Sequence, residues 1–201
     1  MNTKPFSRDF RLMILGQIIS LFGNGILRFA LSLYVLELTG SAAVFGGILA
    51  LSMVPTVLCA PAGGVLADRV NRKAIMIGAD LGIGLVSLVF AFVIMGGGLS
   101  LWLIALIAVV RAVGQAFHGP AMMAAMPLLV PERHLLRVNT LDQALASVAS
   151  IGAPAFGIFL YTTLGFPAVM LLDFAGACIA VAGLAFAKIP TVRDEKAAHE
   201  N

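Results

Sequence analysis

The chain has 201 residues, of which 60% are hydrophobic and only 11% are charged. Soluble domains are about half apolar and about a quarter charged, so this chain has too few charges to cover a water-exposed surface. Its two cysteines lie in apolar runs, without cysteine or histidine neighbours at metal-ligand spacing, which excludes a disulfide scaffold and predicts no metal site. The composition therefore predicts an integral membrane protein.

Six apolar stretches predict six transmembrane helices, because one helical crossing takes about 20 residues. They cover residues 12–37, 43–67, 74–96, 100–128, 138–163 and 166–187, and the breaks between them carry turn residues or charges. The predicted fold class is an all-α membrane protein. Residues 1–190 are expected to form the bundle, and residues 191–201 a polar cytoplasmic tail.

The placement of lysine and arginine predicts the orientation. Eleven of the thirteen basic residues flank the stretches on one face of an even-helix topology, and the loops on the opposite face contain none. The positive-inside rule then places both termini in the cytoplasm, with the chain in the cell (inner) membrane. No basic stripe is interleaved with aromatic residues, so nucleic-acid binding is excluded.

The first predicted helix carries a polar stripe whose members fall within about 80° of one another. The stripe consists of Gln17, Asn24, Arg28 and Ser32. A charged side chain at mid-membrane costs about 2.5–3.5 kcal/mol on insertion scales, so the stripe is expected to face the bundle interior or a water-filled cavity. The same stretch is too long for a signal peptide and contains Arg28 in its middle.

The second and third predicted helices are joined by the string GVLADRVNRK, which runs from Gly64 to Lys73. Asp68 can pair locally with the three bases of this turn, while the bases hold the loop on the cytoplasmic side. Asn71 is suited to a left-handed backbone at the turn. From composition alone, a solvated loop and a functional latch both stay open.

The fourth predicted helix repeats the polar pattern at spacings of 4 and 3 residues. Its stripe consists of Arg111, Gln115 and His118. For Arg28 and Arg111 two roles stay open, contact with a substrate or coupling ion in a central cavity, or a structural ion pair. Asp80 and Asp173 are the acids available for such a pair. His118 could exchange a proton near neutral pH or be structural.

The fifth predicted helix is expected to be bent, and polar residues recur at corresponding positions in the two sets of three helices. Gly152, Pro154 and Gly157 are expected to bend the fifth helix, since proline and glycine do so in membranes. The first and fourth helices each carry an arginine stripe, and the third and sixth each carry one acid. This pattern is typical of a 3+3 inverted repeat.

No catalytic constellation is present in the sequence. We find no nucleophile elbow, no Walker loop and no paired carboxylates in a polar cleft. The chain is therefore expected not to be an enzyme, to need no cofactor and to draw on an ion gradient if it transports.

The string from Gly64 to Lys73 resembles the G-x-L-A-D-R-x-G-R-K pattern of the major facilitator superfamily, with Asn71 where the family usually has glycine. Arg111 with Gln115 resembles the family's R-x-x-Q-G motif at one residue looser spacing. The segment Gly152 to Gly157 resembles the exporter motif G-P-x-x-G, with one inserted alanine. The segment Pro120 to Asn139, together with Asp173, is similar to the macrolide-efflux and siderophore-export branch.

The resemblance implies that this chain is the N-terminal six-helix half of such a transporter. It also implies a latch at the cytoplasmic gate, made by Gly64, Asp68, Arg69, Arg72 and Lys73. The family has two six-helix halves, so a second half or a self-dimer is expected as partner, beside the lipid bilayer.

The predicted function is proton-coupled secondary transport, exporting a small amphiphilic compound that is drug-like, macrolide-like or siderophore-like. Alternating access in this fold rocks one half against the other around a midplane site. The alternative is a truncated or non-transporting membrane interaction protein that keeps the same scaffold.

Overall fold

The computed structural model of the protein describes residues 7–98 and 100–190, so the expected tail at 191–201 lies outside the described residues. The described residues form seven α-helices and no strand. The helices are α1 (Arg8–Thr39), α2 (Ala42–Leu51), α3 (Val54–Arg69), α4 (Arg72–Met95), α5 (Leu101–Leu129), α6 (Glu132–Leu164) and α7 (Phe166–Phe186).

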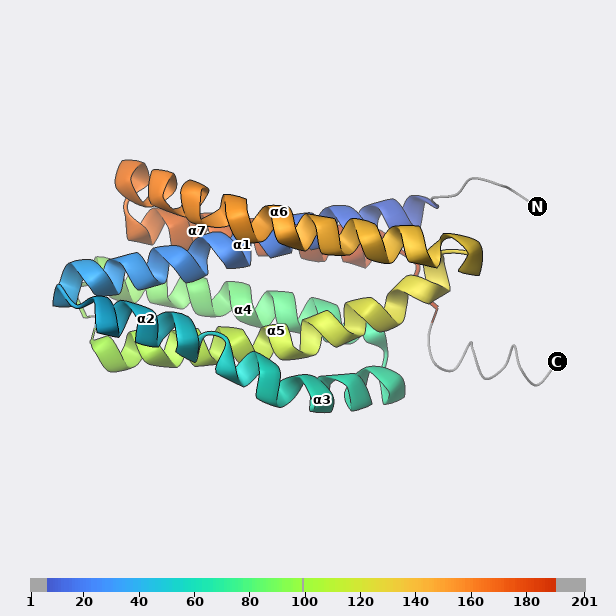
Figure 1. The fold of residues 1–201 in the computed structure, drawn as a ribbon, viewed down its shortest axis with the longest axis horizontal. Helices are drawn as coiled ribbons and strands as arrows, with labels where there is room; N and C mark the ends of the chain where they lie inside the picture. Colours follow the sequence, from blue (N-terminus) through green and yellow to red (C-terminus); the bar gives the residue numbers. More distant parts are fainter. Residues whose placement is uncertain (1–6, 99, 191–201) are drawn as a thin grey trace.

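Six helical segments are long and apolar enough to cross a membrane, and α2 and α3 together make one of them, Ala42–Arg69. The prediction of an all-α membrane protein with six transmembrane helices is therefore confirmed. In Figure 1 the helices run along one common axis, and the start of α1 lies at the same end of the bundle as the end of α7.

The second crossing is broken at Ser52 and Met53, where the sequence predicts one continuous helix. Pro55 has no N–H, so the carbonyl one turn before it loses its helical hydrogen bond. The hydroxyl of Ser52 donates to the Ile48 carbonyl at 2.8 Å and closes the end of α2. Apolar periodicity alone does not reveal such a break.

The loop before α4 differs from its expected backbone. Asn71 has a φ of −59°, and its side chain accepts hydrogen bonds from the backbone N–H groups of Lys73 and Ala74. The residue is thus an N-cap for α4, and the left-handed conformation that asparagine tolerates is not used here. Among the described residues only glycines have positive φ, namely Gly40, Gly97 and Gly165.

The helix contacts confirm the 3+3 inverted repeat. Exchanging α1 with α5, α3 with α6 and α4 with α7 relates the two sets of three crossings. Under this exchange the contact of α1 with α7 becomes that of α5 with α4, and the contact of α1 with α6 becomes that of α5 with α3. The contact between α4 and α7 maps onto itself, so these two helices pack at the symmetry axis.

Small residues allow the closest helix approaches, as is usual in membranes. A Cβ atom added to Gly63 of α3 would lie 2.3 Å from the carbonyl oxygen of Ala116 in α5. At the repeat-related interface, a Cβ added to Gly25 of α1 would lie 2.7 Å from the Cβ of Ala153 in α6. At both of these related interfaces, a glycine of the first repeat allows a close approach to a helix of the second repeat.

We expect Gly63→Ala to destabilise the bundle, because the methyl group must push α3 away from the α5 backbone. Overpacking of this kind costs about 1–3 kcal/mol. Gly78→Ala is the matched control, since nothing lies within 4 Å of the added atom in α4. Thermal unfolding in detergent should show a lower Tm for Gly63→Ala only. Equal Tm values for the two variants would contradict this close contact.

The expected orientation puts the turn between α4 and α5 outside the cell. We expect Gly98→Cys, in a background of Cys59→Ala and Cys178→Ala, to react with a membrane-impermeant thiol reagent on intact cells. Gly98 is chosen because Gly97 has a φ of +76° that disfavours a side chain. Glu132→Cys is the cytoplasmic control and should react only after permeabilisation. Reaction of Gly98→Cys only after permeabilisation would reverse the orientation.

Candidate functional site

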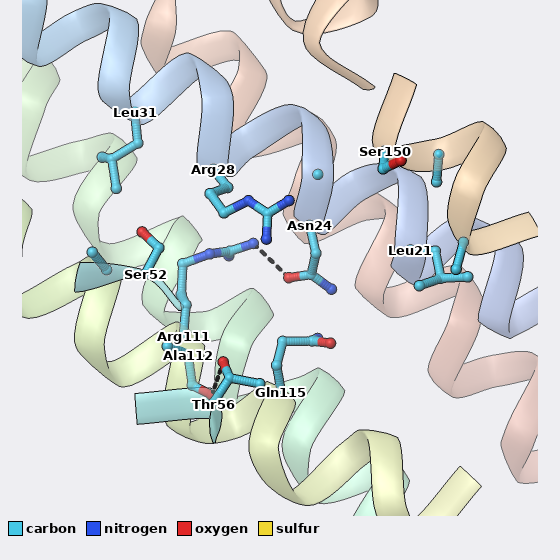
Figure 2. Close-up of a pocket in the computed structure, with 14 residues that line it drawn as sticks. Leu21, Asn24, Arg28, Leu31, Ser52, Thr56, Arg111, Ala112, Gln115 and Ser150 are labelled. Carbon is cyan, nitrogen blue, oxygen red and sulfur yellow. Dashed lines mark hydrogen bonds between the residues drawn. The ribbon is translucent and has the colours of Figure 1, made fainter. Parts of the chain in front are cut away.

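A cavity of about 210 Å³ lies between α1 and α5, flanked by the junction of α2 with α3 and by α6. Its walls combine apolar side chains such as Leu21 and Leu31 with a few polar groups, which is the usual composition of a ligand pocket. Figure 2 shows side chains from both helices extending into this space. The polar groups are Asn24, Arg28, Ser52, Thr56, Arg111, Gln115 and Ser150.

The two arginines of the cavity lie at similar depth but in different surroundings. Arg28 lies 11 residues before the end of α1, and Arg111 lies 10 residues after the start of α5. Arg28 is exposed and forms no ion pair with a described residue, whereas Arg111 is only 6% exposed. The structural ion pair that the sequence left open for both residues is present for Arg111.

Arg111 makes a two-pronged ion pair with Asp173 of α7. Its Nη1 lies 2.6 Å from Oδ2 of the carboxylate, and its Nη2 lies 3.1 Å from Oδ1. The guanidinium also donates to Asn24 Oδ1 at 2.8 Å (Figure 2) and to the hydroxyl of Ser87. Such forked arginine–carboxylate pairs are among the strongest hydrogen-bonded contacts in proteins. Arg111 therefore joins α5 to α1, α4 and α7.

A second acid–base pair lies deeper in the bundle. His118 Nε2 is 3.4 Å from Asp80 Oδ2, and both side chains are 4% exposed. The hydroxyl of Ser20 donates to the other carboxylate oxygen of Asp80 at 3.2 Å. Neither His118 nor Asp80 lines the large cavity. The structure thus separates His118 from the other members of its stripe.

The stripe of the first helix is divided in the same way. Asn24 and Arg28 line the cavity, whereas Ser32 is fully buried and donates to the Arg28 carbonyl at 3.2 Å. Gln17 donates to Asp142 of α6 at 3.5 Å and so bridges two helices. Helical spacing predicts a common direction, but it does not identify the neighbour at each level.

Sequence reasoning missed the serines that connect these groups. Ser20 is one turn before Asn24, and Ser87 is two turns after Asp80, so each shares a helix face with a residue already singled out. Serine is also common in helix packing, which is why the sequence alone did not distinguish these two positions.

The loop between α3 and α4 holds the expected latch residues at one end of the bundle. Asp68 and Arg69 are exposed, while Arg72 and Lys73 are half-buried. The Lys73 ammonium donates to the carbonyls of Ala185 at 2.7 Å and Ala187 at 2.8 Å. These carbonyls end α7, and a cation there complements the helix dipole. The half-buried Gly64 has no neighbour within 4 Å of an added Cβ.

The three residues expected to bend α6 lie within one continuous helix. Gly152 and Pro154 are half-buried, and Gly157 is buried against α1. A Cβ added to Gly157 would lie 3.2 Å from the Ile26 carbonyl oxygen. Gly157 therefore has a packing role in addition to any effect on helix shape.

No group of three or more histidine, cysteine or acidic residues that could hold a metal ion occurs in the described part of the chain. Four buried ionisable residues, Asp80, Arg111, His118 and Asp173, are instead joined in two pairs and to serine and asparagine, whereas Arg28 has no such side-chain partner among the described residues. A six-helix inverted repeat around a central, partly polar cavity is the architecture of half of a secondary transporter.

The chain belongs to the Major Facilitator Superfamily, whose family model matches residues 13–201. It is 39% identical over 179 residues to macrolide efflux protein A of Streptococcus pyogenes, covering 89% of this chain and 44% of that protein. The protein of that name from Enterococcus faecalis is 39% identical over 155 residues, covering 77% of this chain and 48% of that protein. An uncharacterized MFS-type transporter of Bacillus subtilis, YkuC, is 24% identical over 185 residues, covering 92% of this chain and 43% of that protein.

The chain thus spans less than half the length of the curated relatives it matches. The family resemblance drawn from the loop and helix motifs is confirmed, as is the likeness to macrolide-efflux proteins. The matched family is one of membrane transporters, which agrees with a chain that has no catalytic motif.

We expect Arg111→Gln and Asp173→Asn each to lower stability strongly, because each leaves its former partner charged and buried. Breaking one side of a buried ion pair costs about 3–5 kcal/mol. The double variant should regain part of that loss, since no lone charge remains. Arg28→Gln is the control and should keep the wild-type Tm in detergent. If Arg28→Gln lowered the Tm as much as Arg111→Gln, the exposed and the buried arginine would contribute equally to stability, and this prediction would be wrong.

Proposed function

We propose that this chain forms one half of a proton-coupled exporter and that its cavity is one wall of the substrate site. The observation that carries the proposal is that two hydrogen-bond donors of the cavity lack partners among the described residues. Among the residues that the structure describes, Arg28 extends into the cavity without an acidic partner, and Gln115 Nε2 is buried there without a hydrogen-bond partner. Buried donors without partners are rare and often belong to functional sites.

The chemistry of the wall suggests the class of substrate. Leu21 and Leu31 offer apolar contact, while Arg28 and Gln115 offer donors to oxygen atoms. A small amphiphilic compound with several hydrogen-bond acceptors fits both features. The likeness to proteins named for macrolide efflux supports this class.

The surface of the bundle supports a second half as partner. On α6, Gln143, Ser147 and Ser150 are exposed at helical spacing within a membrane-spanning segment. Polar side chains at this depth are unfavourable against lipid and usually face protein or water. A second six-helix bundle, from the same longer protein or from a second copy, would cover this stripe and complete the cavity.

The cytoplasmic end of this half is proposed to carry the gate. Asp68, Arg69 and Arg72 form its acid–base latch, and the termini lie on the same, cytoplasmic side of the inner membrane. The contact of Lys73 with the end of α7 supports this role, because it ties the latch loop to the α7 end of the bundle.

Flux into or out of proteoliposomes that contain the full assembly tests the proposal. We expect macrolide transport that depends on a proton gradient and falls at least about tenfold in Arg28→Gln, since one charged hydrogen bond to the substrate contributes about 1.5–3 kcal/mol. Arg133→Gln changes an exposed arginine in the first turn of α6, outside the cavity, and is the matched control. Absence of flux in a folded wild-type assembly would instead favour a membrane interaction protein with the same scaffold.

A further inference from the structure

A continuous chain of polar groups crosses the bundle between its two acid–base pairs. Arg111 donates to Asn24 Oδ1 at 2.8 Å, Asn24 Nδ2 donates to Ser20 Oγ at 3.2 Å, and Ser20 donates to Asp80 Oδ1 at 3.2 Å. A guanidinium can only donate, so the Asn24 oxygen must face Arg111 and its nitrogen must face Ser20. Every donor in the chain therefore points from Arg111 towards Asp80.

The two carboxylates of this network are related by the inverted repeat. Asp80 is the ninth residue of α4, and Asp173 is the eighth residue of α7, its repeat-related helix. Their partners differ in chemistry, however. Asp173 is held by Arg111, whose charge is permanent, whereas Asp80 faces His118, which can gain or lose a proton.

Asp80 is also the less completely satisfied of the two acids. It is 3% exposed, and within the described part of the chain its Oδ2 has no hydrogen-bond partner apart from the ion-pair contact with His118. A lone buried charge is strongly unfavourable, so this pair is stable when it holds one proton, as imidazolium beside carboxylate or imidazole beside carboxylic acid. Both forms leave the pair with no net charge.

The charged groups around Asp80 agree with one exchangeable proton. The buried set contains two carboxylates and a single guanidinium, so one proton on the Asp80–His118 pair makes the set neutral. From α1 the neighbours are the uncharged Ser20 and Asn24, with Arg28 farther along in the large cavity. From α5 they are His118 and Arg111, and from α7 Asp173.

A small cavity connects the two acids. It is lined by Asp80 and Asp173 together with Ser20, Gly23 and Asn24, and about 20 Å³ of it is open to the centre of a water molecule. That is room for about one water with several polar partners. Such a water would bridge the acids and give a proton a route between the pair and the region of Arg111.

We propose that Asp80 and His118 form the proton-binding site of this transporter, and that Ser20 and Asn24 transmit its state to Arg111 in the substrate cavity. The inference deepens the proposed function and rests on its proton coupling. A proton from water adds to the pair when the pair holds none, and gives neutral imidazole beside a carboxylic acid whose O–H can donate to Ser20. Ser20 then no longer donates to Asp80, and its hydroxyl turns towards a different acceptor. Asn24 stays anchored by its 2.8 Å hydrogen bond to the Ser20 carbonyl, so the change reaches Arg111 through the weaker Asn24–Ser20 hydroxyl contact. The proton leaves to water by the reverse step.

Infrared difference spectroscopy of the full assembly in detergent tests this site without requiring transport. We expect acidification to produce a carboxylic acid C=O band that is lost in Asp80→Asn and kept in Glu132→Gln, an exposed-acid control. Ser20→Ala, a small change that leaves the acid in place, should shift the position of the band, because it removes the hydroxyl that contacts this carboxyl group. His118→Gln should shift it as well.

The outcomes separate this inference from the proposed function. A band that persists in Asp80→Asn, or that is lost in Asp142→Asn instead, would overturn the assignment even if proton-driven flux is present. If Asp80→Asn fails to fold, an unchanged band position in both Ser20→Ala and His118→Gln would overturn it equally. Flux in the Asp80→Asn assembly should continue down a substrate gradient but lose its dependence on the proton gradient. A wild-type assembly without proton-driven flux would defeat the proposed function itself.

Discussion

The pairing of Arg111 with Asp173 is the interaction on which the interior of this bundle depends. A guanidinium in the membrane needs partners, and this one takes them from α1, α4 and α7 while its own backbone belongs to α5. Because four helices meet at one side chain, their rotation about their axes is restricted together. The cavity beside Arg111 is then held in shape by the same contacts that neutralise the charge.

Much of this fold follows from composition and periodicity, because the bilayer constrains both. The six crossings were predicted from apolar length, and the inverted repeat from the arginines and acids at corresponding positions. The break at Ser52 and Met53 was missed because Pro55 changes hydrogen bonding without changing hydropathy. The role of Asn71 as a helix cap was not predicted, because asparagine is suited both to tight turns and to helix N-termini.

The candidate site was harder to predict, because spacing along a helix gives a direction and not a partner. Arg28 and Arg111 have the same chemistry and similar depth, yet only Arg111 meets an acid. The difference arises from which helices lie opposite, because α4 and α7 supply Ser87 and Asp173 to Arg111. Single-sequence patterns contain no information on such pairings beyond the repeat itself.

The uncovered stripe on α6 has a consequence for how the protein is made. Gln143, Ser147 and Ser150 are exposed on the surface of this bundle, within a helix long and apolar enough to cross a membrane. Without the second bundle proposed above, these groups would lie against lipid or draw water into the bilayer, and either state is unfavourable. Biogenesis would therefore favour insertion of the partner soon after this half. An orphaned copy would expose polar groups within the membrane, a feature by which quality-control proteases could recognise it.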